Sequence, residues 1–292
     1  MEWSDECLGV CMEDWLALPA DCADKLLTAY VLYLFQHSAP LSHGTYTCAA
    51  VQLFRPGLRG SLKGAWRALS VWQRSEPTAM RAPLPSCALR GLVVIFLLEG
   101  WTSTAVVTWL AFHTMLRPDE AASLQRRHLT LPRDGALKRT GVVTLLGTKT
   151  ANRGAKVQSV VIWDGELLRC LDSVFGHLDA GYLLCPGGLA QWRKRFVFGL
   201  RALGVVECRF SLASLRAGGA TASFDDGLDL AEIQFRGRWD CAKTLAHYIQ
   251  GANAALAYSR LPSQSLQTLR VLEPQFATLT SSLGRSSFAG AG

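Results

Sequence analysis

The sequence lacks the cysteine and histidine spacings that bind metals. Its nine cysteines include no C-x-x-C pair and no Cys/His set at zinc-ligand spacing, so no zinc site is indicated. The odd number also argues against a framework of paired disulfides. We therefore expect reduced, mostly buried thiols in an intracellular protein, with no metal and no cofactor.

Long apolar runs are absent as well. The most apolar stretches, residues 92–98 and 104–112, are separated by Glu99 and Gly100, and each is too short to span a bilayer. The first residues are acidic, whereas a secretory signal has a basic segment before an apolar run. These patterns predict two buried core helices, no membrane partner and no cleaved leader.

Basic residues are missing from the first 24 positions, which hold seven of the 23 acidic residues. The rest of the chain has 30 basic and 16 acidic residues, a formal charge of +14, compared with +7 for the whole sequence. A globular body this basic favours a polyanionic partner such as nucleic acid.

The chain is long enough for two domains, since 292 residues with 49% hydrophobic content can form two ordinary cores. Helical periodicity predicts helices over residues 24–75, and β-branched runs at residues 142–146 and 157–163 predict a hairpin between later helices. The expected fold is mainly α with a small antiparallel β-sheet. The expected parts are an acidic lead, a helical domain, a proline-rich linker, a mixed domain and a mobile tail, at residues 1–23, 24–75, 76–85, 86–261 and 262–292.

Basic side chains recur along the helical domain, around the turn at Pro56 and along the helix that follows it. Such a row suits phosphate contacts on double-stranded DNA. A solvated basic helix face would give the same pattern, so both interpretations stay open. The residues of this predicted basic stripe are Arg55, Arg59, Lys63, Arg67 and Arg74.

The most informative segment spans residues 209–250, where an arginine, a glycine pair, a tryptophan and a tyrosine occur together. The glycine pair follows Arg216 within a helix-forming run and permits a close backbone approach. Trp239 and Tyr248 are nine residues apart, so a turn followed by two helical turns brings both side chains toward one site.

This segment resembles the tyrosine recombinase, or phage integrase, family. The family's second box reads H-x-x-R and is followed by a G-[HW] pair and by a tyrosine nine positions later. The corresponding residues here are Ala213, Arg216, Trp239 and Tyr248, so alanine stands where the family has histidine. The strings SLRAGGAT and GRW are most similar to eukaryotic, transposon-associated and algal-type members. The resemblance covers about residues 24–260.

The resemblance implies a helical DNA-clamping domain joined to an α+β catalytic domain. It implies that Tyr248 attacks a DNA phosphodiester and forms a covalent 3′-phosphotyrosine link. Arg117, supported by Glu120, would bind the phosphate together with Arg216. Trp239 would pack against the site and donate its indole N–H to a phosphate oxygen.

Two further positions bear on the proton transfers. In the family a hairpin lysine protonates the leaving 5′-oxygen, a role that Lys149 fits best and Lys156 less well. Ala213 can neither accept nor donate a proton, which puts the expected catalytic competence in question.

Three functions agree with these residues. The first is a site-specific recombinase or integrase that works on double-stranded DNA as a homotetramer. The second is a domesticated or decayed integrase-like protein that holds DNA but cuts it poorly, and the third is a related type IB-like topoisomerase. An intracellular, DNA-associated location is expected, in the nucleus if the source is eukaryotic.

Overall fold

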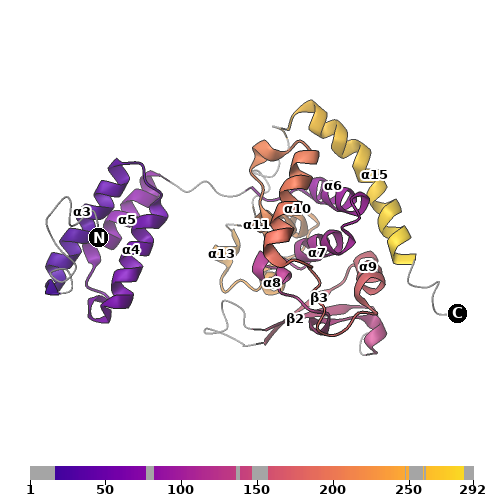
Figure 1. Cartoon of the computed structure of the whole chain (residues 1–292), viewed down its shortest axis with the longest axis horizontal. Helices are drawn as coiled ribbons and strands as arrows, with labels where there is room; N and C mark the ends of the chain where they lie inside the picture. Colours follow the sequence, from indigo (N-terminus) through magenta and orange to yellow (C-terminus); the bar gives the residue numbers. More distant parts are fainter. Residues whose placement is uncertain are drawn as a thin grey trace. The chain divides into compact units, whose positions relative to one another are not determined.

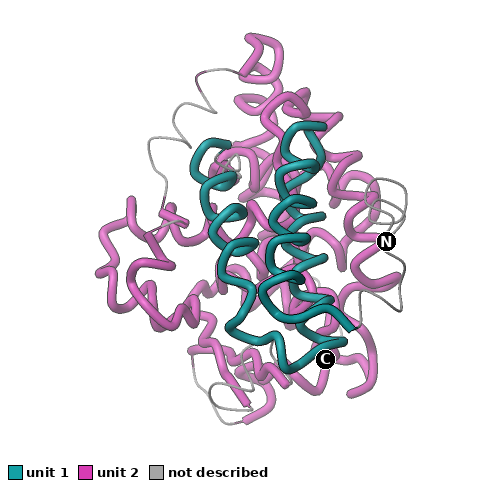
Figure 2. Tube along the Cα trace, turned by 90° about the vertical axis from the view of Figure 1, so that its left-hand side faces the viewer, with its two compact units in different colours: residues 1–80 teal, residues 81–292 magenta. Residues whose placement is uncertain are grey.

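The chain divides into two compact units, residues 1–80 and 81–292, in a computed structural model (Figures 1 and 2). The structure describes seven stretches of the chain, namely residues 17–76, 82–135, 139–146, 157–246, 248–249, 259 and 261–285. No helix within these residues is both long and apolar enough to cross a membrane.

The first unit packs its described helices around a core of its own. These are α3 (Ala20–Gln36), α4 (Leu41–Phe54) and α5 (Lys63–Ser75), with a short 3-10 turn, η1 (Pro56–Leu58), between the last two. All three helices contribute apolar side chains at helical spacing, which confirms the predicted helical character of this region. Buried members of this core include Leu27, Val31, Cys48, Leu69 and Trp72.

Asp24 connects two of these helices. Its carboxylate accepts hydrogen bonds from the main-chain N–H groups of Gly64 and Ala65, at 2.8 and 2.9 Å, in the first turn of α5. A carboxylate there pairs N–H groups that have no partner within the helix. Since α3 begins at Ala20, the predicted acidic lead over residues 1–23 is too long by four residues, and residues 1–16 lie outside the described part.

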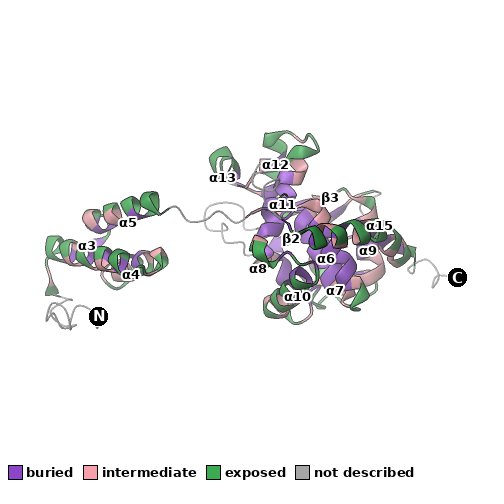
Figure 3. Cartoon of the chain, turned by 90° about the horizontal axis from the view of Figure 1, so that it is seen from above, coloured by how far each residue is buried: buried purple, intermediate pink, exposed green. Residues whose placement is uncertain are grey.

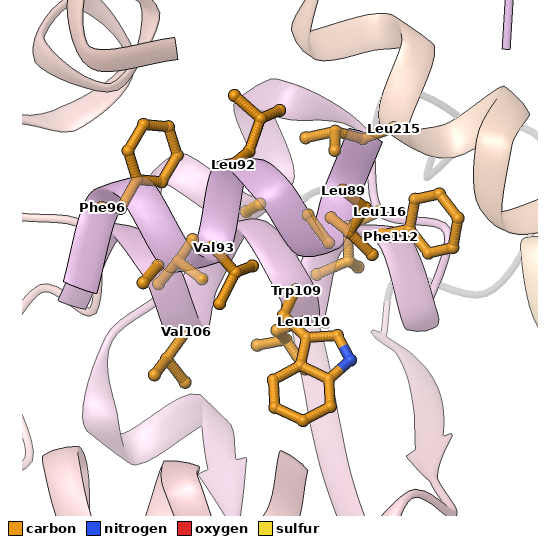
Figure 4. Close-up of a cluster of buried hydrophobic side chains, with 14 of the residues drawn as sticks. Leu89, Leu92, Val93, Phe96, Val106, Trp109, Leu110, Phe112, Leu116 and Leu215 are labelled. Carbon is orange, nitrogen blue, oxygen red and sulfur yellow. The ribbon is translucent and has the colours of Figure 1, made fainter. Parts of the chain in front are cut away.

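The second unit is built around two buried, largely apolar helices. They are α6 (Ser86–Leu98) and α7 (Thr102–His113), as the apolar stretches predict, and residues 104–112 of α7 are all buried. Figure 4 shows Leu92, Phe96 and Trp109 among the side chains that fill this core. A helix that is apolar on every side must be covered on every side. The other elements of the unit provide that cover.

Six further helices and three 3-10 turns lie among the described residues between 118 and 246, and Figure 3 shows α11 largely buried among them. They are α8 (Pro118–Ala122), α9 (Gly165–Phe175), α10 (Gly188–Ala202), α11 (Leu212–Asp225), α12 (Leu230–Gly237), α13 (Ala242–Ala246), η2 (Arg126–His128), η3 (Pro132–Asp134) and η4 (Val206–Cys208).

A three-stranded antiparallel sheet contains the predicted hairpin. Its strands are β1 (Leu129–Thr130), β2 (Gly141–Leu146) and β3 (Val157–Ile162), in the order β1-β2-β3. Val143 of β2 pairs with Val160 of β3, and both are buried. The predicted fold class, mainly helical with a small antiparallel sheet, is therefore confirmed.

The linker predicted over residues 76–85 ends earlier than expected. Leu84 is buried in the core of the second unit, and its main-chain N–H donates to the carbonyl of Ser214 at 3.0 Å. Ala82 also packs against that core. Residues 77–81, the centre of the predicted linker, lie outside the described residues.

The C-terminal region differs most from the sequence-based expectation. A mobile tail was predicted from residue 262 because Ser, Thr and Gly are frequent there, but the structure has a 23-residue helix, α15 (Ser263–Arg285). It packs against α6 and α9 (Figure 1), and its Phe276 ring meets Trp109 edge-on at 4.8 Å between centroids. The mixed domain thus extends past residue 261. The apolar residues that recur at helical spacing are Leu266, Leu269, Leu272, Phe276, Leu279 and Leu283.

Candidate active site

Helix α11 carries Arg216 and packs its backbone directly against neighbouring segments. A Cβ added at Gly218 would collide with the carbonyl oxygen of Leu84, and one at Gly219 with that of Phe112. Only glycine permits such an approach. The close approach predicted for this glycine pair is confirmed, and it places Arg216 in the interior of the second unit.

Arg216 is only 3% exposed, and backbone carbonyls hold its guanidinium group. Nη1 donates to the carbonyl of Met115, and Nη2 donates to that of Gly237 at 2.6 Å. The guanidinium carbon lies 4.3 Å from the centroid of the Trp239 ring and 5.7 Å from that of Tyr248. Cations are attracted to aromatic faces at such distances. The structure therefore brings three of the predicted site residues together.

Burial is the main influence on the electrostatics of Arg216. Together with repulsion from Arg117 and Arg238, it lowers the pKa of the Arg216 guanidinium to about 9, and Glu120 and Tyr248 oppose this shift. A cation that is poorly solvated and has cationic neighbours gains more than an exposed one from a nearby anion. The site is therefore suited to bind a negatively charged group.

Glu120 bridges two arginines that are far apart in the sequence. Its Oε1 accepts a hydrogen bond from Nη1 of Arg117 at 2.7 Å, and its Oε2 accepts one from Nη2 of Arg238 at 2.8 Å. Oε2 also accepts the main-chain N–H of Arg117 at 2.9 Å, at the start of α8. Burial alone would raise the pKa of the Glu120 carboxyl, but Arg238 and Arg117 together lower it below its usual range. Glu120 is thus a carboxylate that fixes both guanidinium groups.

Arg238 is the residue of this cluster that the sequence analysis missed. It caps the end of α12 in a left-handed conformation, with φ 58° and ψ 47°. Burial is the largest cause that lowers the pKa of its guanidinium, and Glu120 opposes that shift. The available signal was an arginine directly before Trp239 and directly after a glycine.

Trp239 and Tyr248 lie against each other, as their nine-residue spacing predicts. Their ring centroids are 5.0 Å apart, with 53° between the planes. Trp239 is 6% exposed, and its indole N–H has no hydrogen-bond partner among the described residues. Tyr248 is half-buried, and its main-chain carbonyl accepts a hydrogen bond from the Thr221 hydroxyl at 3.1 Å. The tyrosine is therefore both positioned by the fold and partly accessible.

Gly237 makes room for the tryptophan ring. A Cβ added at this position would overlap several atoms of the Trp239 indole, so any other residue must displace the ring. We expect Gly237→Ala to lower the free energy of unfolding by about 1–3 kcal/mol, as overpacking does in tight cores. Alanine otherwise favours a helix over glycine by about 1 kcal/mol, so this loss would run against helix propensity.

Chemical denaturation of Gly237→Ala measures this effect, with Gly181→Ala as the matched control. A Cβ at Gly181 meets nothing within 4 Å, so the control should stay within about 0.5 kcal/mol of the wild type. Equal stability of Gly237→Ala and the wild type would contradict the packing described for Trp239.

Of three further predicted positions, the structure describes Ala213 but neither of the two lysines. Ala213 lies in the first turn of α11, half-buried and three residues before Arg216, so the two share one side of the helix. Lys149 and Lys156 both fall outside the described residues, between the end of β2 and the start of β3. Their predicted role remains a prediction.

The predicted basic stripe is only partly a common face. Lys63, Arg67 and Arg74 are exposed on α5 at spacings of four and seven residues, which places them on one side of that helix. Arg59 is exposed in the turn before the helix. Arg55 is only partly exposed and its Nη2 donates to the carbonyl of Leu18 at 2.8 Å, whereas the bond from Arg74 Nε to the carbonyl of Ser70 stays within α5. The Arg55 side chain is therefore partly engaged within the first unit.

The cluster formed by Arg117, Arg216, Arg238, Glu120 and Tyr248 has three guanidinium groups and one carboxylate. The formal charge of the cluster is +2, and the Arg216 guanidinium lies over the Tyr248 ring. Such a cluster suits a phosphate group, because guanidinium groups present paired donors to phosphate oxygens. Among the described residues, no group of three or more His, Cys, Asp or Glu side chains is placed to hold a metal ion.

Comparison with known proteins gives matches in structure and none in sequence. No protein-family model matches the chain, and no curated protein matches it. A crystal structure of the XerH site-specific recombinase, bound to a palindromic difH substrate in a post-cleavage complex, is similar with a TM-score of 0.51 at 14% identity, over 87% of this chain and 75% of that one. A pre-cleavage complex of XerH with a difH substrate gives a TM-score of 0.48 at 14% identity, over 81% and 70%. The first of these similarities shows that the chain has the tyrosine recombinase fold.

Proposed function

We propose that this protein is a site-specific recombinase that cleaves and rejoins DNA strands through a covalent 3′-phosphotyrosine intermediate at Tyr248. The observation that carries the proposal is the position of the Arg216 guanidinium over the rings of both Trp239 and Tyr248. The fold shared with a recombinase that was solved on its DNA substrate supports it further.

The reaction follows from the residues around Tyr248. The phenolic oxygen attacks the phosphorus of a DNA phosphodiester, and the bond from phosphorus to the 5′-oxygen breaks. The phenolic proton is released during the attack, because phenols ionise only near pH 10. A proton goes to the departing 5′-oxygen, for which Lys149 is the proposed donor. Attack by a 5′-hydroxyl on the phosphotyrosine then rejoins the strand, and no energy-rich cofactor is needed because the ester is conserved.

The arginines stabilise the charge that develops on the phosphate. Both Nη atoms of Arg216 already donate one N–H to a backbone carbonyl, and each has a second N–H left for a phosphate oxygen. Arg117 is more exposed than Arg216 and is held by Glu120. One well-placed donor of this kind contributes about 3–4 kcal/mol to transition-state stabilisation.

A second candidate function is a DNA-binding protein that cuts poorly. Ala213 favours it, because the residue three positions before Arg216 has no group that transfers a proton. The two candidates share the fold and the DNA partner and differ only in the rate of strand cleavage. A recombinase assembles four protomers on two DNA sites, so such an assembly would distinguish it from a topoisomerase.

Covalent capture tests the proposed function. Because cleavage by a recombinase depends on its binding sequence, a pool of randomised duplexes is first enriched by rounds of binding to the protein. The enriched duplexes are then nicked near the candidate cleavage site, so that the short 5′-hydroxyl fragment diffuses away and traps the intermediate. A protein–DNA adduct that survives a denaturing gel is expected. Bound DNA without an adduct would favour the binding-protein alternative.

DNA affinity should fall steeply with salt, because the protein releases counterions from the phosphates that it neutralises. The slope of log K against log[salt] is expected to be clearly negative, and each lost phosphate contact should reduce its magnitude by about 0.9. The triple variant Lys63→Gln, Arg67→Gln, Arg74→Gln should therefore show a slope that is smaller in magnitude by about 2–3.

Titrations by fluorescence anisotropy at several salt concentrations measure these slopes. Lys25→Gln is the control within the same unit, since Lys25 is highly exposed on α3 and lies 3.9 Å from Asp21. A wild-type slope near zero would argue against DNA as the partner. An unchanged slope in the triple variant would mean that these α5 side chains face solvent and do not contact DNA.

A further inference from the structure

Arg238 has more hydrogen-bonding capacity than the protein uses. Its side chain is 8% exposed, and Nη2 donates to Glu120. Nε and Nη1 are buried and have no acceptor among the described residues. A buried donor without a partner carries a desolvation penalty, and the penalty is larger for a charged group. Two such donors on one guanidinium need an acceptor that the described residues do not supply.

The unused donors belong to a wider set around the same site. Nε of Arg216 and the indole N–H of Trp239 are also buried without a partner among the described residues. Glu120 does not pair with them in the structure, where its oxygens accept hydrogen bonds from the main chain and Nη1 of Arg117 and from Nη2 of Arg238. Four buried donors on Arg216, Arg238 and Trp239 thus have no acceptor among the described residues, in a cluster with an excess of positive charge.

The chemistry of these donors selects the ligand. Guanidinium N–H groups are charged donors in one plane, and they match the oxygens of a phosphate or a similar oxyanion. A phosphodiester adds one negative charge and two non-bridging oxygens, so it reduces the excess of positive charge and accepts from several donors. The hydrogen bond from Nη2 to Glu120 fixes the guanidinium group of Arg238 beside Arg117.

We propose that Arg238 is an additional phosphate-binding residue of this site, which donates its unpaired Nη1 group to a non-bridging oxygen while Nη2 stays on Glu120. This inference rests on the proposed function for its ligand, the phosphodiester of a DNA strand. It assigns to Arg238 a direct contact that compensates in part for the donor missing at Ala213.

Inorganic phosphate tests the contact without any cleavage. The thermal unfolding midpoint of the whole protein is measured against phosphate concentration at constant ionic strength, with chloride as the balancing anion. Phosphate should raise the midpoint of the wild type, because a ligand that binds only the folded state stabilises it. Arg238→Lys should bind phosphate about tenfold to a hundredfold more weakly, since lysine keeps the charge but has no second nitrogen beside the one that binds Glu120.

Two control variants separate direct binding from other effects. Arg90→Lys makes the same chemical change at an exposed arginine that pairs with Glu273, and it should bind phosphate as the wild type does. Glu120→Gln removes the carboxylate that holds Arg238 but leaves all donors in place. Because glutamine keeps an oxygen acceptor and removes a competing negative charge, Glu120→Gln should lose less phosphate affinity than Arg238→Lys if Arg238 contacts phosphate directly. A loss in Glu120→Gln equal to that in Arg238→Lys would overturn the direct contact in favour of a positioning role.

A second substitution protects the test against misfolding. Arg238→Asn suits the left-handed backbone, because asparagine adopts positive φ more readily than most residues. If Arg238→Lys does not fold, Arg238→Asn should show the same weakened phosphate binding. Wild-type affinity in any folded Arg238 variant would overturn the proposal, and so would a wild-type protein that phosphate does not stabilise.

Strand cleavage distinguishes this inference from the proposed function. Phosphate binding that depends on Arg238, in a protein that forms no DNA adduct, would support the site while the recombinase function fails. An adduct that forms equally well in the wild type and in Arg238→Lys, with equal phosphate binding, would overturn the role of Arg238 while the recombinase function stands.

Discussion

Tyr248→Phe is expected to bind DNA within about twofold of the wild type and to give no covalent adduct, because only the attacking oxygen is lost. The phenylalanine ring keeps the contact with Trp239, whose centroid lies 5.0 Å away, and keeps the ring beneath the Arg216 guanidinium. The arginine cluster around Glu120 is untouched. Fluorescence anisotropy should therefore show nearly unchanged DNA binding in this variant, while a denaturing gel shows no adduct.

Tyr182→Phe is the matched control for that result. Tyr182 is in the same unit, and it is 41% exposed, so the control removes a solvent-accessible tyrosine hydroxyl from elsewhere in the fold. Its adduct yield should equal that of the wild type. An undiminished yield in Tyr248→Phe would remove Tyr248 from the mechanism and leave the cluster as a phosphate-binding site only.

Ala213→His is expected to raise the rate of strand cleavage, by up to roughly 10²–10⁴-fold, the range typical of general acid–base groups. An imidazole has an unperturbed pKa of about 6.5, which suits proton transfer near neutral pH. Ala213 is half-buried in the first turn of α11 on the same side as Arg216, so a larger side chain there reaches the solvent-accessible part of the site. DNA affinity should change little.

Ala213→Gln is the control for added bulk and hydrogen bonding, because an amide does not transfer protons near neutral pH. It should cleave no faster than the wild type, and Tyr248 must stay necessary in the Ala213→His protein. If Ala213→His cleaves at the wild-type rate while it folds and binds DNA, the DNA-binding alternative gains. The missing histidine would then not be what limits the reaction.

The parts of the fold that could be predicted from the sequence are those with uninterrupted patterns. The apolar stretches located α6 and α7, and the β-branched runs located β2 and β3. Helix α15 was missed because small polar residues separate its apolar positions, so composition suggested a tail where the period of three to four residues indicates a helix.

The contacts of the candidate site could be predicted where they depend on the spacing of residues within one short segment. The contact of Trp239 with Tyr248 follows from nine residues of chain, and the support of Arg117 by Glu120 follows from one helical turn. Arg238 could not be found in that way, because its contact with Glu120 spans 118 residues of sequence. The burial of Arg216 against two backbone carbonyls was equally hidden, since it depends on how α11, the end of α7 and the end of α12 pack together.

The attachment point of DNA on the protein tests the central claim most directly. The trapped adduct is digested with nuclease and trypsin, and the peptide that carries a nucleotide remnant is sequenced by tandem mass spectrometry. Cleavage after Lys243 and Arg260 gives one peptide with two tyrosines, Tyr248 and Tyr258, so fragment ions must separate them. The account predicts the remnant on Tyr248. A remnant on Tyr258 or on any other residue would contradict it.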